Sequence, residues 1–174
     1  MVKMDWLVRP FVWISRITHC RGFGIQSPTD YSTVRYVICE HWPYYQYHSL
    51  GEGHDWLARK IGRLCFRIAN WRQPRVIESD AWQPWLKAGC QSAVFGSSTE
   101  LICLSAAECR RRLTSIYNKA DDATVLIVTD IRHDKPLWQH ITASERARIT
   151  FDLYYCGIVL FDSKRHKCNY IINF

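Results

Sequence analysis

Residues 75–85 read Arg-Val-Ile-Glu-Ser-Asp-Ala-Trp-Gln-Pro-Trp, and this stretch decides how the fold is interpreted. Val76 and Ile77 form a short apolar strand that ends at Glu78. In α/β sheets that hold nucleotide cofactors, glycines follow such a strand, because only a backbone without side chains lets the ligand approach closely. Here residues 79–81 and two tryptophans take that place. Either the sheet is of another class, or it has lost its usual means of holding a cofactor.

The chain after residue 73 alternates predicted strands and helices. The predicted strands cover 75–78, 92–95, 100–104, 124–129, 149–154, 158–161 and 170–174, and the helices 84–90, 106–118 and 136–143. The run 124–129 is almost wholly apolar, which is typical of a parallel strand covered on both faces. Cys156-Gly157 is interpreted as the turn of a C-terminal antiparallel hairpin. Parallel strand–helix units that end in such a hairpin predict an α/β domain of three layers.

The first 73 residues are predicted to be helical. Ser27 caps a helix that extends to about His41, with Pro28 at its first position. A polar loop is expected over 49–54, followed by a helix over 55–71 with apolar residues at helical spacing on one face. We therefore expect a single domain, 1–174, in which 1–73 form a helical cap and 74–174 a shortened core.

Composition narrows the class of protein. The chain has 174 residues, a net charge of +7 and no run of about 18 apolar residues, so no transmembrane helix is expected. Residues 1–20 do not resemble a signal peptide, which makes the cytoplasm the expected location. The eight cysteines contain no Cys-x-x-Cys pair and are interpreted as free thiols. A metal site from His19, Cys20, Cys39 and His41 would lack the spacing of structural zinc.

Basic residues cluster at 110–112 and 164–167 and recur over 59–72. Such a charge balance permits an acidic partner, nucleic acid included. No nucleic-acid-binding motif accompanies it, so these side chains are interpreted as solvated helix faces and a polar turn. On the predicted helix 55–71, Arg59, Lys60, Arg63 and Arg67 are placed largely opposite the apolar face.

Three stretches of the chain resemble a known family. Residues 21–28, Arg-Gly-Phe-Gly-Ile-Gln-Ser-Pro, resemble the N-terminal signature HGFGVHSPF of the S-adenosylmethionine-dependent class I methyltransferase-like proteins of Bacteroidetes-type bacteria. Residues 63–78 are similar to the helix that leads into that family's first strand. Residues 149–174 are similar to its terminal antiparallel strands, and 125–131 to its late parallel strand. The resemblance implies a Rossmann-like, methyltransferase-type three-layer sandwich, here shortened and degenerate.

The chain departs from that family where the cofactor is held. The glycine-rich loop is absent after Glu78, and a strand–helix unit is reduced or missing before Glu100. Of the acidic pair near the late strand only Asp130 remains. The resemblance implies S-adenosylmethionine as cofactor, if any is bound, with Glu78, Asp80 and Asp130 as cofactor-binding residues at the carboxyl ends of strands. The alternative is that these carboxylates only stabilise loops and helix starts. No catalytic residue is identified.

Alternative roles remain open for several other side chains. Trp82 and Trp85 are expected to fill the vacated pocket as core, or else to stack on a planar ligand. The aromatic stretch 42–47 either contacts a substrate or partner or forms a plug between helices. Asp130, His133 and Asp134 are residue types that bind metal ions, but no additional strong ligand lies near them in the sequence. They are therefore interpreted as polar surface residues.

Three functions therefore remain open. The first is a methyltransferase-fold pseudoenzyme that binds a protein partner or forms a homodimer through its N-terminal helices. The second is an active methyltransferase that acts on a small-molecule acceptor. The third, less favoured, is a basic nucleic-acid-binding module.

Overall fold

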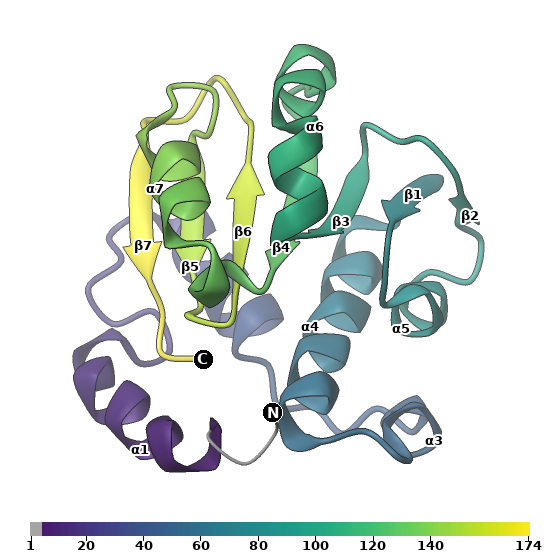
Figure 1. Ribbon diagram of the computed structural model, residues 1–174, viewed down its shortest axis with the longest axis vertical. Helices are drawn as coiled ribbons and strands as arrows, with labels where there is room; N and C mark the ends of the chain where they lie inside the picture. Colours follow the sequence, from purple (N-terminus) through teal and green to yellow (C-terminus); the bar gives the residue numbers. More distant parts are fainter. Residues whose placement is uncertain (1–4) are drawn as a thin grey trace.

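A seven-stranded mixed sheet forms the centre of the protein (Figure 1). The computed structural model describes residues 5–174, so residues 1–4 of the N-terminal stretch lie outside it. The sheet order is β2-β1-β3-β4-β6-β5-β7. The strands are β1 (Val76–Ser79), β2 (Val94–Phe95), β3 (Leu101–Ser105), β4 (Val125–Thr129), β5 (Ile149–Asp152), β6 (Cys156–Leu160) and β7 (Cys168–Ile171). β6 is antiparallel to both of its neighbours, and the other pairs are parallel.

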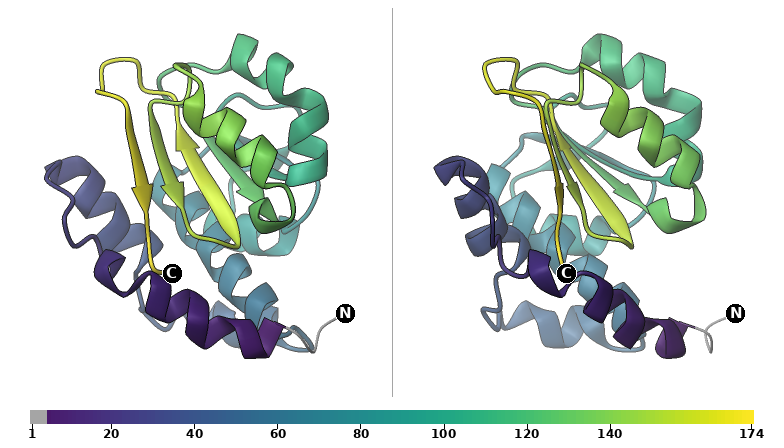
Figure 2. Two further views of the ribbon diagram at one scale, coloured as in Figure 1. Left: turned by 60° about the vertical axis from the view of Figure 1, so that its left-hand side comes forward. Right: turned by 90° about the vertical axis from the view of Figure 1, so that its left-hand side faces the viewer.

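Helices cover both faces of this sheet, so the fold has three layers (Figure 2). They are α1 (Asp5–Ser15), η1 (Ile17–His19), α2 (Pro28–Thr33), η2 (Val34–Ile38), α3 (Gln46–Gly51), α4 (Trp56–Arg72), α5 (Gln83–Gly89), α6 (Ala106–Lys119), η3 (Ile131–His133) and α7 (Lys135–Ala143). The green helices α6 and α7 lie on one face, and α4 with the N-terminal helices lies on the other. The predicted α/β class with helices on a largely parallel sheet is confirmed at this level. Among the described residues, no helix is long and apolar enough to span a membrane.

Side-chain caps explain where several helices begin. Ser27 Oγ accepts a hydrogen bond from the backbone N–H of Asp30 at 3.3 Å, as its position before Pro28 predicted. Asp55 caps α4 in the same way, accepting from the N–H of Ala58 at 2.7 Å. Each cap satisfies a backbone donor that the first turn of a helix leaves unpaired.

The apolar residues of β4 alternate between two cores. Val125 and Ile127 belong to the cluster shared with α4 and α5, whereas Leu126 and Val128 belong to the cluster under α6 and α7. All four are at most 1% exposed. This is the burial on both faces that the continuous apolar run predicted.

Two glycines let α5 approach α4 closely. A Cβ at Gly62 would lie 2.3 Å from the indole of Trp85, and one at Gly89 would lie 2.2 Å from the backbone oxygen of Phe66. Real Cβ atoms do not come so close, so larger residues there would push the helices apart. This contact holds the chain that follows β1 against α4.

The N-terminal helical predictions need two corrections. The helix expected from Ser27 to about His41 is α-helical only to Thr33, and it continues as a π-helical segment that ends at Ile38. The polar loop expected over 49–54 is partly helical, because α3 extends to Gly51. For α3 the reason is a tertiary contact: Tyr47 buries its ring against Phe66, which no local propensity records.

The C-terminal strands also differ from prediction. Cys156-Gly157 does not form the turn of the hairpin; the turn is at 153–155, and Cys156 already belongs to β6. The last strand is β7 at 168–171 rather than 170–174, and it pairs with β5 in parallel. The antiparallel pair is therefore β5–β6, and the chain adds a further parallel strand after it.

Candidate functional site

Two cavities are candidates for the functional site. The smaller, of about 350 Å³, lies where β1 and β3 end, between α5 and α6. Glu78 and Asp80, two of the three predicted cofactor-binding residues, line it together with Glu108 and Arg112. The structure thus brings these two carboxylates to one place, as strand ends in an open α/β sheet should do.

Glu78 is engaged inside the protein. It forms an ion pair with Arg112 of α6, and its other oxygen accepts a hydrogen bond from the N–H of Ser98 at 3.0 Å. Its side chain is only 13% exposed. This largely buried carboxylate has one oxygen on a cation and the other on a backbone donor, so a ligand would have to share or displace these contacts.

Asp80 is used in a similar way. Its carboxylate accepts hydrogen bonds from the N–H of Ser105 at 2.9 Å and from the Ser105 hydroxyl at 2.6 Å. Ser105 in turn caps α6 by accepting from the N–H of Glu108 at 3.4 Å. Asp80 therefore ties the loop after β1 to the start of the next helix on the sheet.

The third predicted residue, Asp130, does not line this cavity. It is exposed, has a left-handed backbone with φ of 62°, and its backbone oxygen accepts from the N–H of His133. Asp134 caps α7 and pairs with Arg110 at 2.5 Å, which lowers the pKa of its carboxyl. Among residues 5–174, no group of three or more potential ligands that could hold a metal ion is present.

The tryptophans after β1 have divided roles. Trp85 is 2% exposed and packs into the core against Tyr47, with ring centroids 6.0 Å apart. Trp82 is half-buried, packs against the same core, and adopts a left-handed φ of 67°. Trp85 fills the interior as predicted and is not available to stack on a ligand.

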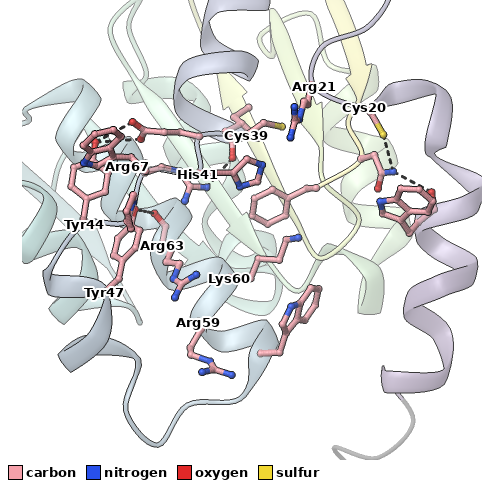
Figure 3. Close-up of a pocket in the computed structure, with 18 of the residues that line it drawn as sticks. Cys20, Arg21, Cys39, His41, Tyr44, Tyr47, Arg59, Lys60, Arg63 and Arg67 are labelled. Atoms are coloured by element: carbon pink, nitrogen blue, oxygen red, sulfur yellow. Dashed lines mark hydrogen bonds between the residues drawn. The ribbon is translucent and has the colours of Figure 1, made fainter.

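The larger cavity, of about 900 Å³, lies among the N-terminal helices (Figure 3). Its cationic side chains are Arg21, Arg59, Lys60, Arg63 and Arg67. Its aromatic side chains are Trp13, Trp42, Tyr44, Tyr47, Trp56 and Phe174. Glu40 is the one acidic residue among the lining residues that the structure describes. A cavity of this size suits a small molecule, and its charge favours an anion.

Helix α4 supplies most of that charge. Arg59, Lys60, Arg63 and Arg67 recur at spacings of three and four, which places them along one face of the helix with Trp56. Figure 3 shows Arg59, Lys60 and Arg63 projecting from this helix at the cavity. The prediction that these residues form a solvated face is wrong for Arg67, which is 6% exposed. Its guanidinium donates to the backbone oxygens of Val37 and Ile38 at 2.7 and 2.8 Å.

Lys60 is held by aromatic rings. Its ammonium lies 4.8 Å from the ring centroid of Trp56 and 4.6 Å from that of Phe174. Burial lowers the pKa of Lys60, and the positive charge of Arg67 acts in the same direction. Among the side chains that the structure describes, Lys60 forms no ion pair with an acidic residue. A partly buried ammonium whose only neutralising contacts are aromatic rings is costly, and an anionic ligand would lower that cost.

The remaining wall combines polar and aromatic groups. The Tyr44 hydroxyl donates to the Glu40 carboxylate at 3.2 Å, and Tyr44 packs against Tyr47. Burial lowers the pKa of His41, as does the nearby positive charge of Arg21. In the aromatic stretch 42–47, Tyr47 is a buried plug, which is one of the two predicted roles, whereas Trp42 lines the cavity and is 67% exposed. Contact of the stretch with a substrate or partner stays a prediction.

The thiols near this cavity do not form a reactive or metal-binding centre. All eight cysteines are free, as predicted, and burial raises the pKa of Cys39. Cys20, Cys39 and His41 do line the same cavity, which the sequence spacing alone did not indicate. A neutral Cys39 thiol is a weak nucleophile, so the arrangement supports binding rather than covalent chemistry.

Sequence reasoning missed this cavity because its parts are far apart in the chain. Residues 20–21, 38–48, 56–67 and 173–174 meet only after folding. The one local signal was the recurrence of cations on α4, and it was interpreted as a solvated surface. Searches of family models, of curated proteins and of solved structures found no match to this chain.

Proposed function

We propose that the chain is a methyltransferase-type α/β protein that has lost or impaired its binding of S-adenosylmethionine and acts by binding another protein molecule. The observation that carries this proposal is the internal use of the strand-end carboxylates. Glu78 pairs with Arg112, and Asp80 accepts two hydrogen bonds from Ser105. A cofactor would have to displace these contacts, and no glycine loop follows β1 to receive it.

The sheet topology supports the methyltransferase-type assignment. The family that the sequence resembles ends in antiparallel strands, and β6 is inserted antiparallel between β4 and β5. β1, β3 and β4 are parallel neighbours. The extra parallel strand β7 and the two-residue β2 are where this chain departs from that pattern.

The larger cavity is a poor substitute for the lost cofactor site. S-adenosylmethionine carries a positively charged sulfonium. Lys60, Arg63 and Arg67 surround the cavity with like charge. We therefore expect the larger cavity to repel S-adenosylmethionine, which we propose the strand ends have lost the ability to bind.

The N-terminal helix offers the surface for a protein partner, and we propose a second copy of this chain as that partner. Phe11, Trp13 and Ile14 of α1 are 73, 53 and 60% exposed, and Phe23 nearby in the chain is 78% exposed. Exposed apolar side chains gathered on one helix mark interaction sites, and a homodimer would cover the same patch on both subunits.

Two measurements test the proposal. Isothermal titration with S-adenosylmethionine and S-adenosylhomocysteine is expected to show no binding at micromolar concentrations, whereas micromolar affinity would favour an active methyltransferase. Light scattering after gel filtration is expected to show a dimer that Phe11→Glu converts to a monomer. The control is Val94→Glu, at an exposed position on β2, which should leave the dimer intact. A monomeric parent protein would overturn the homodimer.

A further inference from the structure

We propose that the 900 Å³ cavity among the N-terminal helices binds a nucleoside di- or triphosphate, with the phosphates along α4 and the base against the aromatic wall. This site is separate from the strand ends and does not depend on the proposed function. It is assigned from charge, shape and the chemistry of the lining residues.

The cations of α4 define the anionic part of the ligand. Arg59, Lys60 and Arg63 have no ion pair with an acidic side chain in the part of the chain that the structure describes. Some arginines elsewhere on the protein are matched: Arg110 pairs with Asp134 and Arg112 with Glu78. Unmatched cations on one side of a cavity raise the local concentration of anions.

The spacing of these cations favours a chain of phosphates over a single carboxylate. From residue 59 to residue 63 a helix rises about 6 Å. One carboxylate or one phosphate would engage a single point on that row, whereas two or three linked phosphates can contact several of its members. Arg63 supplies a planar fork suited to phosphate oxygens, and Lys60 a compact point charge.

The aromatic residues define the rest of the ligand. Trp42, Tyr44, Trp56 and Phe174 line the same space as the cations. Lys60 already lies over the rings of Trp56 and Phe174, and Tyr44 packs against Tyr47. Trp42, which is 67% exposed, therefore offers the most open ring of the four. Planar bases stack on such side chains largely regardless of their sequence identity. An inorganic polyphosphate would make no use of the Trp42 ring.

Glu40 adds an acceptor that fits a nucleoside. Among the lining side chains that the structure describes, its carboxylate is the only acidic one, and it already accepts a hydrogen bond from the Tyr44 hydroxyl. Carboxylates accept hydrogen bonds at several lone pairs, so capacity remains for ribose hydroxyls or an exocyclic amine. A ligand made only of anionic groups would be repelled by it.

The test is isothermal titration of the full chain with adenosine triphosphate in the absence of divalent cations. Binding is expected with a dissociation constant below about 100 μM at low salt, and with at least about tenfold weaker binding of adenosine and of inorganic triphosphate. Raising the salt should weaken it, because exposed charges are screened. No added metal ion is expected to be needed, since the protein's own cations neutralise the phosphates.

A matched pair of double variants decides whether the cavity is responsible. Lys60→Gln with Arg63→Gln is expected to weaken adenosine triphosphate binding by about tenfold or more for each charge removed. Lys119→Gln with Lys164→Gln removes the same charge from elsewhere and should leave the affinity unchanged. Thermal melts of both variants show that each is folded before it is titrated.

Three results would overturn the proposal. They are no binding of adenosine triphosphate, equal affinity for inorganic triphosphate, or an equal loss in the two double variants. The first result, when single-stranded RNA does bind, would identify a nucleic-acid surface instead. Each result is independent of the titration with S-adenosylmethionine, whose binding is expected to fail.

Discussion

The strand-end cavity and the N-terminal cavity differ in whether their charged side chains have polar partners within the protein. At the strand ends, Glu78 and Asp80 are satisfied by Arg112 and Ser105 of the same chain. Among the N-terminal helices, Lys60 is instead held between the rings of Trp56 and Phe174. The first arrangement is structural, whereas in the second an ammonium is partly buried against aromatic rings, which lowers its pKa. The carboxylates at the strand ends, where open α/β sheets usually bind their ligands, are therefore the ones that are paired within this protein.

Helix α4 connects the two regions, because Gly62 contacts Trp85 on one side while Lys60 and Arg63 face the cavity on another. Gly62→Ala is expected to have the largest effect, a loss of about 2–3 kcal/mol in the free energy of unfolding. The added methyl group would have to displace the Trp85 indole, which is 2.3 Å from its position. Urea denaturation measures this loss.

Gly96→Ala is the control for that substitution. A Cβ there would lie 3.7 Å from Val76, an ordinary contact, so a change below about 0.5 kcal/mol is expected. If the two alanine variants were equally stable, the close approach of α5 to α4 would not be a determinant of the fold.

Glu78→Gln tests whether the strand-end carboxylate is structural. We expect a loss of about 2 kcal/mol, because Arg112 and the Ser98 N–H would keep only a neutral partner. Denaturation of the Glu78→Gln, Arg112→Gln and double variants should give a coupling between the two sites. Asp130→Asn, at an exposed left-handed position that also suits asparagine, is expected to be nearly neutral. Additive losses at residues 78 and 112 would argue against a structural ion pair.

Lys60→Met addresses the other region and, apart from the control substitutions, has the smallest expected effect, with the opposite sign. Burial lowers the pKa of Lys60, so its charge opposes folding at neutral pH. An apolar side chain of similar length should raise the melting temperature by about 2–4 °C, which corresponds to ~1 kcal/mol. Scanning calorimetry checks this. A lower melting temperature would mean that the contacts of the ammonium with the two rings outweigh its desolvation.

Local patterns predicted the regular core well. The helix expected over 55–71 is α4 at 56–72, and the apolar run 124–129 is β4 at 125–129. Both carry strong periodicity or continuous apolarity, which tertiary contacts reinforce. The free cysteines and the buried Trp85 were also predicted. The turn of the β5–β6 hairpin was misplaced, because a glycine inside a strand and a glycine in a turn look alike in sequence.

The candidate sites, like the fold, were predicted from the sequence only in part. The sequence alone determined that acidic residues end parallel strands, since the alternation of strands and helices places Glu78 and Asp80 at one edge. Only the tertiary structure decided that Arg112 and Ser105 would satisfy them, and that residues from both ends of the chain would enclose the cations of α4. Periodicity reports which face of an element is apolar; it does not report which distant side chains will pair with its charges, because those partners are brought together by packing.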